Sequence, residues 1–178
     1  KQHFVLFGEY IPFEEKIAFI NALTPINSSF RAGSESTMFR LPVVDRPFSV
    51  LICFEDTLPT LARRAALGGA RWLINQTNDS WFDPDSGSTQ HFAHSVFRAV
   101  ETRLPLVRCT NTGITCAIDT KGRIRQNLLP RTEGVHVAEV FPAAPDQPQT
   151  FYTRHGDLFA QTCLFGSVAL FVSLCFSS

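Results

Sequence analysis

The sequence ends in a run of nineteen uncharged residues, LFAQTCLFGSVALFVSLCF, from Leu158 to Phe176. A helix that crosses a bilayer needs about 20 mostly apolar residues, so this run predicts a transmembrane helix. A buried C-terminal helix of a soluble domain is the alternative, and polar residues such as Gln161 and Ser167 keep it open. In either case the fold includes a long apolar helix at residues 158–176, in addition to the structure formed by the residues before it.

The remaining residues have the composition of one globular domain. The whole chain has 178 residues, of which 44% are hydrophobic, and this content excludes intrinsic disorder. Sixteen basic residues balance sixteen acidic ones, which argues against a nucleic-acid-binding protein. The five cysteines form no CxxC pair and have no zinc spacing with the histidines, so we expect no metal. We expect a domain over residues 1–141, a Pro- and Ala-rich linker over 142–157 and the membrane helix over 158–176.

Short apolar runs alternate with helical patterns in the first half of the domain. A helix is predicted over Pro59–Ala70, with Thr57 as a possible N-cap and Gly68 at its end, and a second over Gln90–Arg103. The composition of Asp119–Gly122 is typical of a hairpin turn. An α/β layered fold with mostly buried strands is therefore expected. The predicted strands are Phe48–Cys53, Trp72–Asn75, Leu106–Cys109, Thr115–Ile118 and Val135–Val140.

Cys53 is the sharpest candidate for chemistry. It closes a predicted strand just before a polar turn into a helix, where α/β folds expose reactive groups. A helix N-terminus nearby would favour the thiolate, whereas the negative charges of Glu55 and Asp56 would disfavour it. A reactive thiolate here needs a cation close by. The alternative is an ordinary structural cysteine at the end of a strand.

Other polar residues permit two interpretations each. Glu9, Glu55, Asp56 and Asp79 could supply a general base, or could be solvated surface charges. The loop Asn78–Phe82 could shape the mouth of a pocket, or could be a turn pinned by Asn and Asp side chains. Arg98 and Glu101 have the spacing of an ion pair on a helix surface. The histidines lie in no recognisable catalytic context: His3, His91, His94, His136 and His155.

Five segments in order carry a resemblance to a known family: Lys1–Glu14, Leu51–Asp56, Asn75–Phe82, Gln90–Asp119 and Thr150–Asp157. With the hydrophobic run that follows, they resemble the carbon–nitrogen hydrolase (nitrilase) superfamily, and within it the apolipoprotein N-acyltransferases of bacterial envelopes. The resemblance covers nearly the whole chain. It implies part of a nitrilase-like α-β-β-α sandwich, followed by a C-terminal transmembrane helix.

The resemblance also implies roles for individual residues. Cys53 matches the nucleophile that takes the acyl group as a thioester, and Lys1 matches the catalytic lysine that stabilises the thiolate and the oxyanion. Glu9 matches the glutamate of the family's GEY motif, and Glu55 a further functional acidic position. The family's general-base glutamate precedes its lysine, so residues 1–178 alone should be inactive. We expect substrate contacts from Phe54, Asn78 and Trp81.

The activity implied by the resemblance is the transfer of a fatty acyl chain. A phospholipid would give the chain to Cys53, and the N-terminal diacylglyceryl cysteine of an apolipoprotein would then accept it. The reaction would need no metal or cofactor, and would take place on the periplasmic side of the bacterial inner membrane. One alternative is a soluble nitrilase-type amidase that hydrolyses a small amide with the same residues. Another is a non-catalytic, membrane-anchored binding domain.

Overall fold

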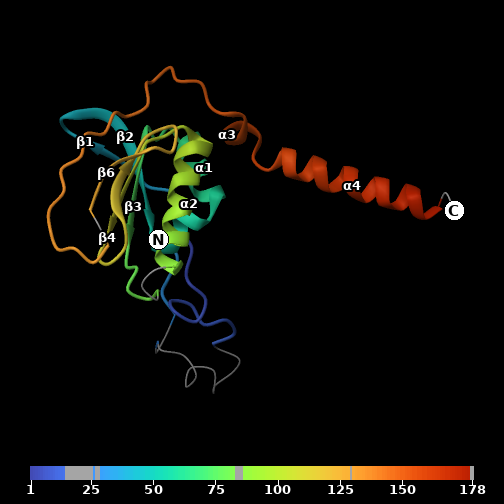
Figure 1. Ribbon diagram of the computed structural model, residues 1–178, viewed down its shortest axis with the longest axis horizontal. Coiled ribbons are helices and arrows are strands. Elements are labelled where there is room, and N and C mark those ends of the chain that lie inside the picture. The colour runs from blue at the N-terminus through green and yellow to red at the C-terminus, as the bar shows by residue number, and fades with distance from the viewer. Residues whose placement is uncertain (15–25, 27–28, 83–85, 129, 177–178) are drawn as a thin grey trace.

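The computed structural model describes residues 1–14, 26, 29–82, 86–128 and 130–176. Its described part contains one sheet with the strand order β1-β2-β3-β4-β5-β6, and Figure 1 shows α1 and α2 together on one face of that sheet. The strands are β1 Met38–Leu41, β2 Val44–Ile52, β3 Trp72–Thr77, β4 Leu106–Thr110, β5 Thr115–Ile118 and β6 Ile124–Leu128. The helices are η2 Cys53–Thr57, α1 Pro59–Leu67, α2 Ser86–Thr102, α3 Phe151–His155 and α4 Leu158–Phe176.

The centre of the sheet is parallel and its two sides are antiparallel. β2, β3 and β4 pair in parallel, whereas β1 joins β2, and β5 and β6 follow β4, in antiparallel pairs. Parallel neighbours need a crossover, which η2 with α1 and then α2 provide. The predicted α/β class is confirmed, and the Asp119–Gly122 turn joins β5 to β6 with Gly122 at φ 77°.

The face of the sheet beneath the helices changes from apolar to polar along the strands. Leu73 of β3 pairs in register with Leu106 of β4, and both side chains are fully buried in the core. Two residues further along, Asn75 pairs with Arg108, and these are also fully buried. Because side chains two apart on a strand point to the same face, the apolar core ends where this polar row begins, toward the carboxyl ends of the parallel strands.

Three expectations about local structure are wrong. Val135–Val140 has the alternation of a strand but pairs with no strand in the described part of the chain, and Val135 and Val137 remain 93% and 84% exposed. The strands β1 and β6 were not expected. Thr57 does not cap α1, because Leu58 occupies that position and the Thr57 hydroxyl donates to the Phe54 carbonyl instead.

The C-terminal apolar run forms a single helix, α4, which is exposed along its whole length. Figure 1 shows it projecting from the domain. The short helix α3 precedes it, inside the segment expected to be a linker, and packs against α1. There Arg63 donates to the carbonyls of Tyr152 and Arg154 at 3.3 and 3.0 Å. The helix α4 is long and apolar enough to cross a membrane.

Truncation of a core leucine tests the packing between the sheet and its helices. The Leu73 side chain is fully buried beneath α1 and α2, so Leu73→Ala should lower the free energy of unfolding by roughly 2–5 kcal/mol. Leu67→Ala is the control, because Leu67 is 45% exposed at the end of α1. Urea denaturation followed by circular dichroism measures both, and equal losses would contradict this assignment of the core.

Candidate active site

Cys53 lies at the carboxyl end of β2, as the first residue of η2. Its backbone has φ 54°, in the left-handed region that costs a non-glycine residue about 1–2 kcal/mol. Its carbonyl accepts a hydrogen bond of 3.2 Å from the Asn75 amide, which emerges from the neighbouring strand β3. A partly exposed cysteine with a strained backbone, at the end of a parallel strand, has the placement of a nucleophile in α/β enzymes.

Glu55 attaches the first residues of the chain to this turn. One carboxylate oxygen accepts from the backbone N–H groups of Gln2 and His3, the latter at 3.0 Å, and the other accepts from Ile52 N at 2.8 Å. The His3 ring also stacks on Phe54, with ring centroids 6.3 Å apart. Segments more than 50 residues apart in the sequence therefore meet at η2.

Lys1 and Glu9 form an ion pair within the attached segment. Glu9 also accepts from the Val5 N–H at 2.9 Å. Burial alone would raise the pKa of Glu9, but the hydrogen bonds from Lys1 and the Val5 N–H, together with the positive charge of Lys1, outweigh it, so the pKa is lowered. The Glu55 contacts thus attach the segment that carries the Lys1–Glu9 pair to the turn that begins with Cys53.

Asp56 points the opposite way from Glu55, into the core. Its carboxylate accepts from His91 Nε2 at 2.8 Å, Ser95 Oγ at 2.5 Å and Arg108 Nη1 at 2.9 Å. Its carbonyl accepts from Arg98 Nη1 at 3.1 Å. The turn is therefore held from α2 and from β4 at once.

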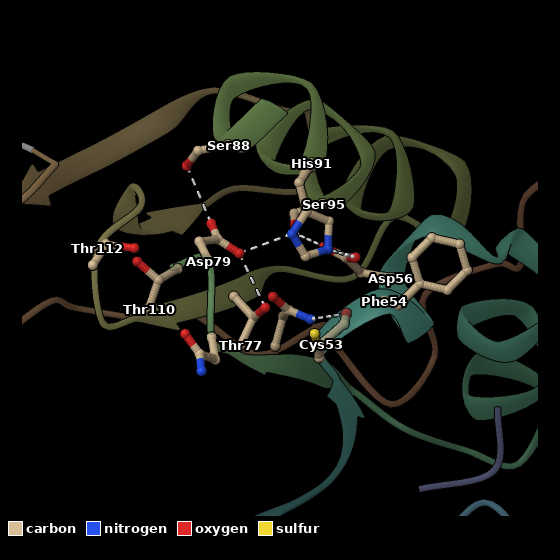
Figure 2. Close-up of polar contacts among 12 residues, drawn as sticks. Cys53, Phe54, Asp56, Thr77, Asp79, Ser88, His91, Ser95, Thr110 and Thr112 are labelled. Carbon is tan, nitrogen blue, oxygen red and sulfur yellow. Dashed lines mark hydrogen bonds and ion pairs between the residues drawn. The ribbon is translucent and has the colours of Figure 1, made fainter. Parts of the chain in front are cut away.

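Asp79 forms the second half of this buried network, after the carboxyl end of β3. Its carboxylate lies 2.9 Å from both His91 Nδ1 and Arg108 Nη2, and it accepts from Thr77 and Ser88 at 3.1 and 3.2 Å. Figure 2 shows the His91 ring between the two aspartates. Burial would raise the pKa of Asp79, but the hydrogen bond from His91 and the charge of Arg108 lower it.

His91 carries a positive charge in this environment. Burial would lower its pKa, but hydrogen bonds to Asp56 and Asp79 outweigh that effect and raise the pKa to about 9. Only the imidazolium donates from both ring nitrogens. With Arg108 also charged, two cations balance two carboxylates, as buried charges require.

The surface interpretation of the acidic residues is wrong for three of the four. Glu55, Asp56 and Asp79 are only 3%, 0% and 2% exposed. The Arg98–Glu101 pair is also not on the surface, because the Arg98 side chain is 4% exposed and reaches the Asp56 carbonyl. These polar groups are buried because each finds charged or hydrogen-bonding partners across the fold.

The residues expected to contact substrate lie at the same edge of the sheet. Phe54 and Trp81 are 37% and 70% exposed. Asn78 instead ties loops together: its side-chain oxygen accepts from Ser80 N at 3.0 Å and from Asn111 Nδ2 at 2.6 Å. The structure thus shows a turn pinned by Asn78, with two aromatic rings at the surface.

Sequence reasoning missed the residues that hold the two aspartates. His91 was considered only as one of five histidines, and Asn75, Ser95 and Arg108 were given no role. A signal was present on α2, where polar residues recur every three or four positions on the face that the structure buries. That polar stripe consists of Ser88, His91, Ser95, Arg98 and Thr102.

Comparisons with known proteins show which family the chain resembles. The family model described as carbon–nitrogen hydrolase matches residues 8–144. The chain is 40% identical over 170 residues to the apolipoprotein N-acyltransferase of Geobacter metallireducens, covering 96% of this chain and 32% of the relative. It is 34% identical over 178 residues to apolipoprotein N-acyltransferase 1 of Treponema denticola, covering 99% and 32%. The chain thus spans about a third of the length of these relatives.

Solved structures share the fold at lower identity. Nit3 of Saccharomyces cerevisiae, a nitrilase-superfamily member, matches with a TM-score of 0.51 and 22% identity over 59% of this chain and 41% of its own. An amidase of the same superfamily from Nesterenkonia matches with a TM-score of 0.50 and 19% identity, covering 58% and 41%. Both support the nitrilase-like fold.

A methyl group at Gly113 tests the close contact between the β4–β5 turn and the buried aspartate. A Cβ there would overlap Asp79 Oδ2 and lie 2.8 Å from Ser88 Oγ, so Gly113→Ala should lower the free energy of unfolding by about 1–3 kcal/mol. Gly134→Ala is the matched control, since its Cβ would meet only Leu128, at 3.9 Å. Thermal unfolding compares them, and an unchanged melting temperature for Gly113→Ala would contradict the packing.

The charge on His91 predicts a loss of stability at alkaline pH. The pKa of His91 is higher in the folded protein than its ordinary value of 6.5, so the charged imidazole stabilises the fold fully below pH 6.5. This stabilisation is lost as the pH rises through about 9. The free energy of unfolding should fall across that window by on the order of 3 kcal/mol, and His91→Gln should abolish this dependence. His94→Gln, on the same helix, should retain it. Urea denaturation at several pH values measures all three, and a wild-type stability independent of pH would exclude the imidazolium.

Proposed function

Because the chain belongs to the carbon–nitrogen hydrolase family, we propose that it carries the nucleophile region of a lipoprotein N-acyltransferase. Cys53 takes a fatty acyl chain from a phospholipid, and the α-amino group of an apolipoprotein's diacylglyceryl cysteine then accepts it. The observation that carries the proposal is the strained Cys53 at the end of β2, whose turn is attached through Glu55 to the segment with the Lys1–Glu9 ion pair. The names of the relatives support lipoprotein N-acylation.

The proposed reaction balances in two steps at one sulfur atom. Cys53 gives up its thiol proton and attacks the ester carbonyl, an S–acyl bond forms as the ester C–O bond breaks, and the departing glycerol oxygen takes up that proton. The acceptor amine then attacks the thioester, an amide forms, and the thiol returns. A covalent intermediate divides one difficult transfer into two easier steps, and neither step changes an oxidation state.

The acidic and basic residues have separate roles in this proposal. Lys1 provides the positive charge that stabilises the thiolate and the tetrahedral oxyanion, and its ion pair with Glu9 positions the amine. Both oxygens of Glu55 already accept backbone N–H groups. We therefore assign Glu55 as a positioning residue that holds the Lys1 segment against η2.

The apolar helix α4 favours transfer between lipids over hydrolysis of small amides. A phospholipid ester stays in the bilayer, so an enzyme that uses it gains from a membrane anchor, and α4 has the length and composition of one. A soluble amidase has no use for a fully exposed helix of this kind. We place α4 in the bacterial inner membrane and the sheet on its periplasmic side, with the exposed rings of Phe54 and Trp81 contacting the lipid substrates.

The test is a serine substitution at Cys53, in the protein expressed as its gene encodes it and kept in native membranes. A phospholipid with a labelled acyl chain and a diacylated lipopeptide serve as donor and acceptor. Cys53→Ser should abolish hydroxylamine-sensitive label on the protein and reduce triacylated lipopeptide at least about 1,000-fold, because the nucleophile is lost.

Cys109→Ser is the matched control for this substitution. Cys109 is also a free cysteine, and it is exposed near the end of β4, so its replacement should leave both signals unchanged. Transfer that survives Cys53→Ser would remove Cys53 from the nucleophile role. Hydrolysis of small amides without any acyl transfer would favour the amidase instead.

A further inference from the structure

Two side chains, His91 and Arg108, connect the two loops of the candidate site. His91 reaches Asp56 in η2 through Nε2 and Asp79, in the loop after β3, through Nδ1, at 2.8 and 2.9 Å. The first loop begins with Cys53, and the second contains Asn78 and Trp81. We propose that His91 and Asp56 form a positioning pair, which fixes the turn of Cys53 and sets its register with the Asp79 loop.

The turn needs such support because its own structure is weak. η2 is a 3-10 helix of five residues, and short 3-10 segments have poor hydrogen-bond geometry. Its first residue, Cys53, has φ 54°, and a strained backbone persists only where the surroundings over-determine it. The contacts of the Asp56 carboxylate with α2 and β4 supply that constraint.

The groups around His91 explain why an imidazolium occupies this position. It faces Asp56 from η2, Asp79 from the loop after β3 and Arg108 from β4, with His94 and Arg98 on its own helix. Two carboxylates on opposite sides require two donors, which a charged imidazole provides in one rigid ring. A glutamine amide carries both of its N–H groups on one nitrogen, so it cannot donate to Asp56 and Asp79 on the opposite sides of the position that the His91 ring occupies.

Arg108 makes the proposed positioning dependent on the charge of His91. Its Nη2 lies 3.2 Å from His91 Nδ1 as well as 2.9 Å from Asp79. When the imidazole is neutral, Nδ1 can accept from Arg108 and no longer donates to Asp79. The link that His91 makes between the two loops is then broken, although Nε2 can still donate to Asp56 and Arg108 still contacts both aspartates.

Hydrogen exchange and kinetics on His91→Gln, Asp56→Asn and the double variant test the pair. We expect each single variant to raise amide exchange about tenfold in peptides covering residues 53–58 and 78–82, while α1 and β3 keep their protection. The rate constant kcat should fall roughly 10- to 100-fold with KM nearly unchanged, because misplacement of the reacting groups affects the chemical step. The double variant should lose no more than the worse single variant, since the two residues act as one unit.

His94→Gln is the control on the same helix, and it should alter neither peptide. Single-variant effects that multiply in the double variant, increased exchange throughout α1 and β3, or unchanged exchange at 53–58 would each overturn the proposal. If His91→Gln does not fold, amide exchange of Asp56→Asn in the same two peptides tests the proposal instead.

The role of the pair in catalysis depends on the proposed function, but the exchange measurement does not. If Cys53→Ser retains acyl transfer while the exchange pattern appears as expected, the proposed nucleophile is wrong and the pair still holds the turn. If Cys53→Ser is inactive and exchange at 53–58 is unchanged in both single variants, only the positioning pair is wrong.

Discussion

The candidate site depends on the burial of two carboxylates behind the turn that carries Cys53. Asp56 and Asp79 are fully removed from solvent or nearly so, which is tolerable only with charged partners of opposite sign. Arg108 and His91 supply those charges from β4 and α2, and each of them contacts both aspartates. The positions of the sheet, the helix and two loops are therefore coupled: displacing any of them would leave a charge unpaired in the core.

The sequence predicted the elements that obey local rules. The runs of β2, β3 and β4 are short and apolar, as buried parallel strands are, and Cys53 closes the first of them. Edge elements were less predictable: β1 and β6 were missed, and Val135–Val140 alternates like a strand without pairing in the described part of the chain. A period-two pattern shows that a segment suits a sheet, but it does not provide the neighbour that completes one.

In the candidate site, too, contacts within one sequence motif were predictable and contacts between distant residues were not. Lys1 and Glu9 are eight residues apart and belong to one motif, so the resemblance could place them together. His91 and Arg108 contact Asp56 across 35 and 52 residues, and nothing local to either residue indicates that contact. The adjacent acidic residues after Cys53 illustrate the difference: Glu55 binds backbone of the entering chain, whereas Asp56 binds side chains of the core. Sequence alone could not assign these opposite directions.

The helix α2 also links the candidate site to α3, the short helix that precedes α4. Its first half carries His91 and Ser95, and at its other end the Glu101 carbonyl accepts from Thr150, which caps α3. Its 17 residues span about 25 Å as one rigid rod. The Arg63 contacts of α1 with α3 add a second connection, so two helices join the Cys53 side of the fold to the segment before α4. In the proposed reaction the donor ester stays in the bilayer, so these contacts matter because they limit how far the Cys53 turn can shift relative to the segment that leads into α4.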